Sequence, residues 1–204
     1  MLNRLGIFDL FSYTLPGGIY LSALITALTL WPIAPAIPNL KLDASVLVIL
    51  VTISYLIGLL VSPVKWTPWD RLFPSRKVET ILEKLQHTYP EVTLKIRPNQ
   101  WPVIQANTAL EDREFSLSVD KLRATHIMLR SVSLALCVFA FLSLAHALGH
   151  PNSLISWLGT IAALGASALA AKGSRTFKSW TYHYTFELMI ARVVKPEDFV
   201  ERKS

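Results

Sequence analysis

The sequence has very few of the residues on which most enzymes and secreted domains depend. It has one cysteine, Cys137, so no intrachain disulfide can form and cysteine usage does not identify a redox compartment. No glycine occurs between Gly58 and Gly149, which excludes a phosphate-cradling P-loop there, because such loops need glycine for close backbone approach. Charged residues make up only 17% of the chain, against about a quarter in soluble domains.

Motifs that would mark a catalytic centre are also missing. The chain has no G-x-S-x-G elbow, no H-E-x-x-H helix and no C-x-x-C pair. His146 and His150 have a spacing that can place two imidazoles on one helix face, but Gly149 and Pro151 are expected to end the helix there. Solvated histidines are therefore the preferred interpretation. The sequence predicts no catalytic site, no metal site and no cofactor.

What the sequence does contain is four long apolar blocks, each close to the length that crosses hydrocarbon as a helix. They cover residues 18–37, 44–61, 127–148 and 154–171, and none contains Asp, Glu or Lys. Ion-coupled transport normally needs ionisable groups at membrane depth, so a carboxylate-driven transporter is disfavoured. The prediction is an all-α integral membrane protein with four transmembrane helices and a small, mostly helical cytoplasmic module.

The distribution of basic residues predicts the orientation of these spans. Residues 62–125 hold ten Lys and Arg and the tail after residue 171 holds seven, whereas the other two connections hold only Lys41. Cytoplasmic loops carry the excess of Lys and Arg, so the large loop and both termini are predicted to be cytoplasmic. The predicted segments are residues 1–61 (entry segment and two spans), 62–125 (loop module), 126–171 (two spans) and 172–204 (tail packing on the module).

Tryptophans lie close to the predicted ends of the spans. Indole prefers the headgroup layer, where its ring is apolar and its N–H can still be hydrogen-bonded. Contact with the lipid bilayer at the membrane interface is therefore predicted for Trp31, Trp66, Trp69, Trp157 and Trp180.

Two spans carry small residues at intervals of four. Small residues let helix backbones approach closely, so such strips predict helix packing, either within the chain or between copies of it. The predicted helix-packing or oligomer contacts are Gly159, Ala163, Ser167 and Ala171 on the fourth span and Ser54 and Gly58 on the second. With two strips available, we expect a homo-oligomer.

The cytoplasmic segments show apolar residues at helical spacing. The periodicity predicts a helix from residue 76 to about residue 89 and a second amphipathic stretch in the tail, where alternating aromatics at 180–186 also permit a strand. A short strand at 91–98 and a helix opening at Trp101 are expected between them. The predicted docking surface for a cytosolic protein partner consists of Val78, Ile81, Leu82, Leu85, Tyr182, Phe186 and Ile190.

Net charge gives little reason to expect nucleic acid as a ligand. The loop has ten basic against eight acidic residues and the tail seven against four, an excess that cytoplasmic orientation already explains. Attraction to anionic headgroups accounts for the remainder. Binding of a nucleotide or nucleic acid is left open but is not indicated.

The N-terminal stretch Phe8-Asp9-Leu10-Phe11-Ser12-Tyr13-Thr14-Leu15-Pro16-Gly17 resembles the F-D-x-F-x-Y-x-x-P-G opening of small multi-spanning proteins encoded in bacterial antiphage defence loci. The membrane subunit of Kiwa and the membrane accessories of some CRISPR and cyclic-nucleotide systems are of this type. The resemblance implies a bacterial inner-membrane protein that oligomerises, works with a cytosolic partner and either senses membrane disturbance or permeabilises the membrane. Pro16 and Gly17 are expected to break a short interfacial helix before the first span.

Two functions follow as hypotheses. The first is a non-enzymatic inner-membrane sensor or scaffold that recruits a cytosolic partner in antiviral defence. The second is a pore or channel that permeabilises the membrane, which would need a polar lining. The residues available for such a lining are Tyr20, Ser22, Thr26 and Thr29, or Thr52, Ser54 and Tyr55. An embedded enzyme acting on lipid lacks any clustered acid, base or metal set.

Overall fold

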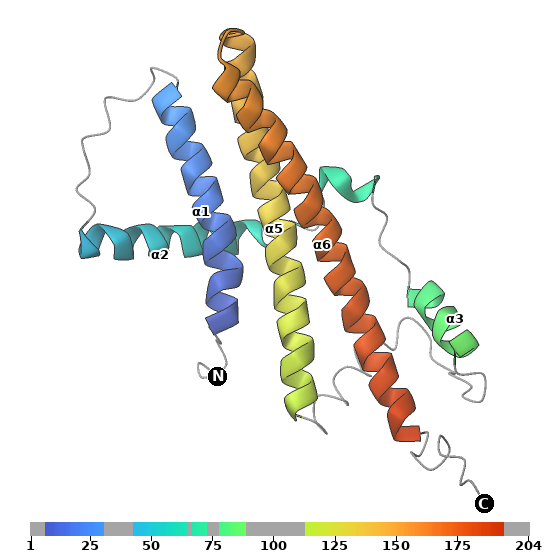
Figure 1. Ribbon diagram of the computed structural model, residues 1–204. Coiled ribbons are helices and arrows are strands. Elements are labelled where there is room, and N and C mark those ends of the chain that lie inside the picture. Colours follow the sequence, from blue (N-terminus) through green and yellow to red (C-terminus); the bar gives the residue numbers. More distant parts are fainter. Residues whose placement is uncertain (1–6, 31–42, 65–66, 73–77, 89–112, 194–204) are drawn as a thin grey trace, which may run out of the picture. The chain divides into compact units, whose positions relative to one another are not determined.

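A computed structural model of the chain describes residues 7–30, 43–64, 67–72, 78–88 and 113–193. All regular structure in this part of the chain is helical (Figure 1). The elements are α1 (Ile7–Leu30), α2 (Ala44–Val61), the short 3-10 helix η2 (Pro68–Asp70), α3 (Val78–Thr88), α5 (Arg113–Gly149) and α6 (Leu154–Val193). The strand expected at 91–98 and the helix expected at Trp101 lie outside the described residues.

Four of these helices are long and apolar enough to cross a membrane, which confirms the predicted number of candidate spans. The qualifying stretches are Leu10–Leu28, Ala44–Val61, Ser116–Gly149 and Leu154–Leu188. The second has the predicted bounds, and the tail is helical through the aromatic segment rather than extended. Most side chains of α2 are exposed and apolar, and such a surface is compatible with contact with lipid.

The predicted start of the first span is wrong. Pro16 was expected to end a separate interfacial helix, but α1 runs through it without a break from Ile7 to Leu30. Proline removes one backbone N–H donor and crowds the preceding turn, which bends or breaks many helices in water. Apolar helices tolerate proline when neighbouring helices pack around it, and the Pro16 side chain is almost fully buried.

The chain divides into two compact units. Unit 1 comprises residues Met1–Pro74 and Ala124–Ser174, and unit 2 comprises Ser75–Arg123 and Arg175–Ser204. The segment after α2 belongs to unit 1 as far as Pro74. The predicted loop module, residues 62–125, included this segment. Helices α5 and α6 contribute residues to both units.

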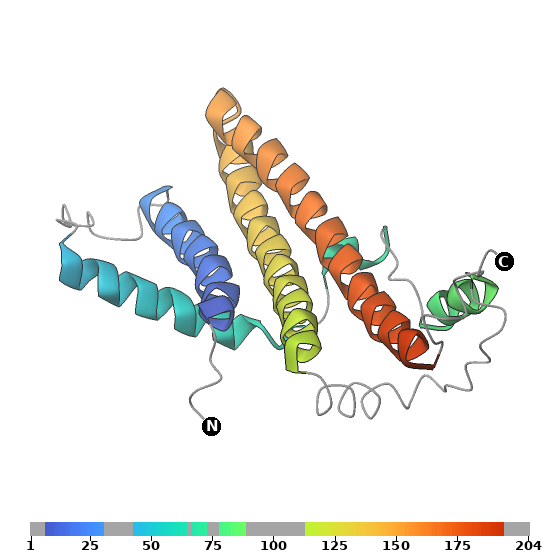
Figure 2. The same ribbon diagram turned by 60° about the horizontal axis from the view of Figure 1, so that its bottom comes forward.

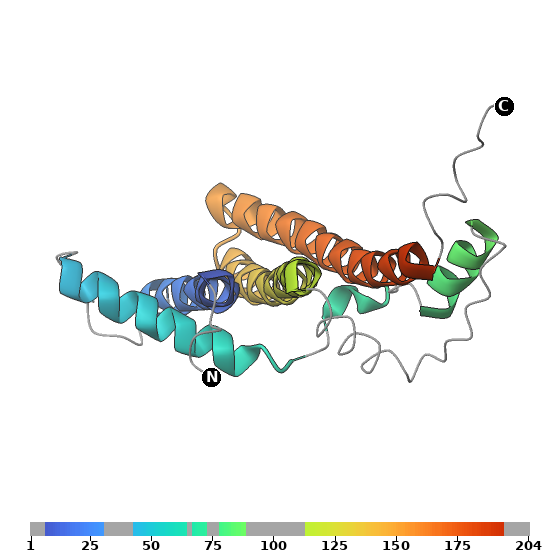
Figure 3. The same ribbon diagram turned by 90° about the horizontal axis from the view of Figure 1, so that it is seen from below.

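In unit 1, α2 crosses α1 with almost no space between the two backbones. A Cβ added to Gly17 would overlap with the carbonyl oxygen of Ser54, and one added to Gly58 would overlap with the carbonyl oxygen of Tyr13. Figure 3 shows α2 running across the N-terminal half of α1. The absence of side chains at Gly17 and Gly58 is what allows this approach. Beside the crossing, the rings of Tyr13 and Tyr55 meet edge to face with centroids 5.9 Å apart.

The start of α2 is fixed by its capping residue. Asp43 has extended backbone angles, and its carboxylate accepts hydrogen bonds from the Ser45 hydroxyl at 2.6 Å and the Val46 N–H at 2.9 Å. These two hydrogen bonds hold the pKa of the Asp43 carboxyl below its usual value, and the bond from Ser45 is the larger cause. A charged cap of this kind satisfies an amide that the first helical turn leaves without a partner.

Unit 2 has its own apolar core. Its most completely buried side chains are Ile81, Leu85, Val119, Phe186 and Ile190. Four of these residues, all except Val119, belong to the partner-docking surface predicted from the sequence. Periodicity finds the apolar face of an amphipathic helix but does not say whether the same chain covers it. In this structure they form the interior of the module, and a partner cannot reach them while it stays folded.

Candidate functional site: a polar interface between α5 and α6

Ser167 lies at the centre of a buried polar cluster where α6 meets α5. Its hydroxyl donates to the Ser133 carbonyl oxygen at 2.6 Å, and the Ser133 hydroxyl lies 2.9 Å from the Ser167 carbonyl oxygen. The Cys137 thiol is 3.0 Å from the same hydroxyl of Ser167. Ser133 and Ser167 are both completely buried. Reciprocal hydroxyl-to-carbonyl bonds of this type hold helices together in apolar surroundings, where no water competes for the donors.

The small-residue strip of α6 faces this interface along its length. Ala163, Ser167 and Ala171 are buried, and a Cβ on Gly159 would lie 3.2 Å from the Ser143 hydroxyl of α5. Figure 2 shows α5 and α6 side by side where they leave their connecting turn. The shorter strip on α2, Ser54 and Gly58, is buried against α1. Both predicted strips are thus used in packing within the chain, and neither is left open to a second copy.

A third element is joined to the same cluster by Trp69 of η2. The indole N–H of Trp69 donates to the Ser167 hydroxyl at 2.8 Å. This bond fastens the segment that follows α2 to the last helix of unit 1. Of the other predicted interface tryptophans, Trp157 donates to the Pro151 carbonyl oxygen at 3.3 Å and Trp180 is half-exposed, packing edge to face on Phe177. Trp31 and Trp66 lie outside the described residues.

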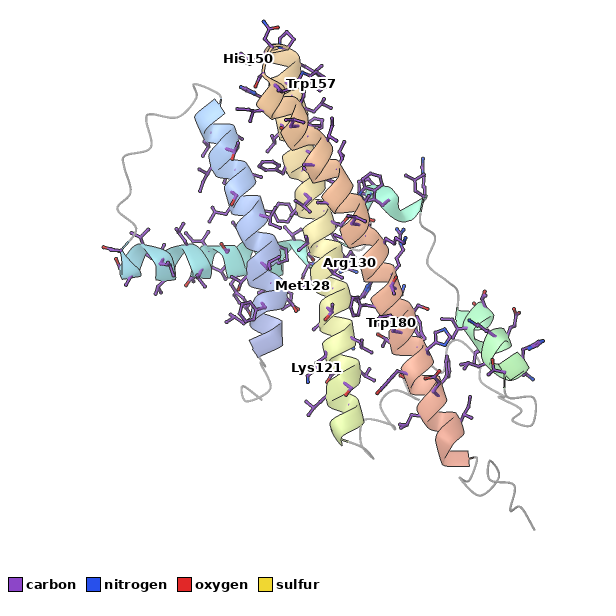
Figure 4. All side chains as sticks on the ribbon, in the orientation of Figure 1. Lys121, Met128, Arg130, His150, Trp157 and Trp180 are labelled. Carbon is purple, nitrogen blue, oxygen red and sulfur yellow. The ribbon has the colours of Figure 1, made fainter. Side chains whose placement is uncertain are left out.

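Arg130, the one charge within the predicted spans, connects α5 to α2. Its guanidinium donates to the Ser62 carbonyl oxygen at 2.8 Å, directly after the last residue of α2. Figure 4 labels Arg130 on α5. The C-terminal carbonyls of a helix lack intrahelical partners and carry partial negative charge, so a cation there is favourable. No local sequence pattern indicates this pairing, because Arg130 and Ser62 are 68 residues apart in the chain.

His126 and Ser174 form a close pair that has the composition, but not the geometry, of a catalytic dyad. Nδ1 of His126 lies 2.9 Å from the Ser174 carbonyl oxygen and 2.8 Å from its hydroxyl. A carbonyl only accepts, so Nδ1 carries the proton and cannot remove one from Ser174. The Ser174 hydroxyl instead donates to the His126 carbonyl oxygen at 3.1 Å. The pair joins the backbones of α5 and α6.

Three of the seven residues proposed as a pore lining have hydroxyls bonded to their own helices. Those of Ser22, Thr26 and Thr52 each donate at 2.8 Å to the carbonyl oxygen four residues earlier. Side chains bonded in this way are compatible with lipid and do not require water. The hydroxyl of Tyr20 is buried without a hydrogen-bond partner among the described residues, so it does not face a water-filled path either.

These contacts describe a site whose chemistry is helix association. Within the described residues, no group of three or more His, Cys, Asp and Glu side chains is placed to hold a metal ion. No protein-family model, curated protein sequence or solved structure was found to match the chain. Function is therefore inferred from the residues of this chain alone.

Proposed function

We propose that the chain is a non-enzymatic sensor or scaffold of the bacterial inner membrane, with cytoplasmic termini, whose cytoplasmic unit recruits a cytosolic protein partner. The N-terminal resemblance to membrane proteins of antiphage loci supports a role in antiviral defence. The observation that carries the proposal is the continuity of α5 and α6, which pass from unit 1 to unit 2 without interruption.

The lengths of these helices exceed what a bilayer needs. Helix α6 has 40 residues and α5 has 37. At 1.5 Å per residue they are about 60 and 55 Å long, roughly twice the thickness of the hydrocarbon core. Charged residues resume on α6 at Lys172, so the part from there to Val193 lies beyond the hydrocarbon in this proposal. Each helix then has residues in the membrane unit and in the cytoplasmic unit.

Such helices can transmit a change in the bilayer to the cytoplasm. A span responds to a change of hydrocarbon thickness by tilting. A tilt change of about 10° would move the end of a cytoplasmic extension ~33 Å long by roughly 6 Å. The α5–α6 bonds centred on Ser167 keep the two helices moving together, and the bond from Arg130 couples α2 to them. This is a physical route from membrane disturbance to a changed docking surface.

Partner docking is assigned to the exposed apolar side chains of unit 2. Leu117, Trp180 and Tyr184 are each about half exposed, and the last two are one helical turn apart on α6. Leu82, from the predicted set, is partly exposed and remains a candidate. Apolar and aromatic residues left uncovered at such positions are typical of protein contact surfaces.

Self-association is assigned to a face of α6 beside the buried strip. Ala162 and Ala166 are exposed there, and a Cβ added to Gly165 would meet nothing within 4 Å. This second set of small residues has the spacing that lets two spans approach closely, and nothing in unit 1 occupies it. A second copy of the chain is the partner proposed for this face.

Two measurements on purified protein test the sensor hypothesis against the pore. Reconstituted alone in liposomes, the chain is expected to leave trapped ions in place, because the hydroxyls of Ser22, Thr26 and Thr52 are bonded to their own helices. Steady leakage that disappears on Thr26→Val would instead establish the pore. In host cells, Tyr184→Arg is expected to lose a co-purifying cytosolic protein that Glu187→Ala, an exposed control on the same helix, retains. Equal recovery with both variants would remove the docking assignment.

A further inference from the structure

The turn between α5 and α6 carries two histidines whose rings are stacked. The imidazoles of His146 and His150 have centroids 4.5 Å apart and planes inclined by 19°. Helix α5 ends at Gly149, as Gly149 and Pro151 predicted, and the His150 N–H still bonds the His146 carbonyl oxygen at 3.0 Å. The two side chains therefore keep the one-turn relation of helical residues four apart. Figure 4 shows His150 and Trp157 at this turn.

The hydrogen bonds of the pair leave the same nitrogen free on each ring. Nδ1 of His150 lies 3.3 Å from the His146 carbonyl oxygen, which can only accept, so Nε2 of His150 carries the lone pair. Nδ1 of His146 lies 2.9 Å from the Ser156 hydroxyl, which is itself 2.9 Å from the Ser153 hydroxyl. No hydrogen bond from a described residue occupies either Nε2. Metal-binding histidines typically have this arrangement, with the other ring nitrogen held by a carbonyl or hydroxyl.

We propose that Nε2 of His146 and Nε2 of His150 bind one divalent transition-metal ion of the Zn²⁺, Cu²⁺ or Ni²⁺ class, with water completing the coordination. Neutral imidazole is a preferred ligand of these ions, whereas Mg²⁺ and Ca²⁺ prefer oxygen. Two histidines four apart on a helix already form the metal-binding pair of known zinc sites. Two nitrogens bound to one tetrahedral ion are about 3.3 Å apart with both lone pairs aimed at it, so the rings have to turn out of their stacked arrangement to share the ion.

The surroundings of the pair suit an open site for a cation. Residues 149–153 contain no Lys or Arg that would repel a dication. His150 is exposed and His146 is partly exposed, so an ion can enter from solvent without rearrangement of the fold. Ser156 orients His146 through Nδ1 and is itself held by Ser153. In the proposed topology this turn faces away from the cytoplasm, so the site would respond to metal outside the cell.

Titration of the full chain in detergent with Zn²⁺, followed by calorimetry, tests the site. One ion per chain is expected, with affinity reduced at least tenfold in His150→Gln and in His146→Gln and unchanged in the control His87→Gln. Ser156→Ala should weaken binding on the order of tenfold through the orientation of His146. Mg²⁺ should give no binding heat.

A second measurement distinguishes the loss of a metal ligand from the misfolding of a variant. Bound Cu²⁺ should show the paramagnetic resonance pattern of two equivalent nitrogen ligands in the wild-type chain and of one in His150→Gln, whose position is exposed and tolerant of substitution. The proposal is overturned if the His146→Gln, His150→Gln double variant, shown to be folded by circular dichroism, binds Zn²⁺ as tightly as the wild-type chain.

Discussion

At the scale of single residues, two glycines determine whether α1 and α2 can meet. Gly17 faces the backbone of Ser54, and Gly58 faces the backbone of Tyr13. The neighbouring Gly18 differs, because a Cβ there would have its nearest contact, the Ser54 hydroxyl, at an ordinary 3.8 Å. The chain therefore contains a required glycine and a replaceable one side by side.

This difference predicts the outcome of two alanine substitutions. Gly17→Ala is expected to push the helices apart and to destabilise the protein by about 1–3 kcal/mol, since neither backbone can give way locally. Gly18→Ala should change stability by less than about 0.5 kcal/mol. Thermal unfolding in detergent micelles measures both. Equal melting temperatures for the two variants would show that the helices do not cross at Gly17.

The same residues show where local sequence reasoning fails. Pro16 followed by Gly17 has the local signature of a helix break, and the predicted first span accordingly began too late. The reason that the helix continues is not local: a second helix packs on these residues and covers the proline. A single sequence does not show which helix covers which residue. The helix break was therefore predicted from the local preferences of proline and glycine, which tertiary packing overrides here.

At the scale of elements, α6 has two faces lined with small residues and only one of them is filled. Ala163 is buried at the α5 interface, whereas its neighbour Ala162 is exposed. The sequence identified the strip containing Ala163 by its spacing of four, and the structure shows the partner to be α5. The spacing could not distinguish a partner in the same chain from one in another copy.

Two leucine substitutions separate these faces. Ala163→Leu is expected to destabilise the folded chain by about 1–3 kcal/mol, because the added atoms have no space against α5. Ala162→Leu should leave the melting temperature within a few degrees of wild type but reduce the oligomer to a smaller species. Size-exclusion chromatography with light scattering, beside thermal unfolding, measures both effects. An oligomer that survives Ala162→Leu would assign self-association to a different surface.

Whether a feature of these elements could be predicted depends on how far apart in the sequence the interacting residues are. Helix α2 was predicted with its observed bounds, because a long apolar run supplies its signal locally. Helix α5 begins at Arg113, well before the span predicted at 127–148, because an apolar run marks the part of a helix that lies in lipid and not its full length. Contacts of Ser167 with Ser133 and Trp69 join positions 34 and 98 residues apart, and no local pattern encodes such pairs.

At the scale of the whole molecule, the arrangement of charge predicts the side of the membrane on which each connection lies. Seventeen Lys and Arg lie in residues 62–125 and after residue 171 together, whereas the α5–α6 turn at 149–153 has none. Positive connections stay on the cytoplasmic side. With four candidate spans, both termini are then predicted to lie on the same side.

Reporter fusions test this topology directly. An enzyme that is active only outside the cytoplasm should be inactive when fused after Ser204 and active when inserted at Asn152, in the α5–α6 turn. The reverse pattern is expected for a reporter active only in the cytoplasm. Activity of the first reporter at Ser204 would contradict the orientation, and with it the assignment of unit 2 to the cytoplasm.

The bond between Trp69 and Ser167 sets an order for the assembly of unit 1 during synthesis. A ribosome makes the chain from its N-terminus, and 98 positions separate the two residues, an interval of roughly 5–20 s of translation. The crossing at Gly17 and Gly58 involves only residues that exist by then, so α1 and α2 can pair early. The segment around Trp69 has to wait, with its indole bonded to water or headgroups, until the final span arrives. A nascent chain stopped before residue 154 would therefore contain the paired helices α1 and α2. It would lack the Trp69–Ser167 hydrogen bond, which holds the segment after α2 in the finished protein.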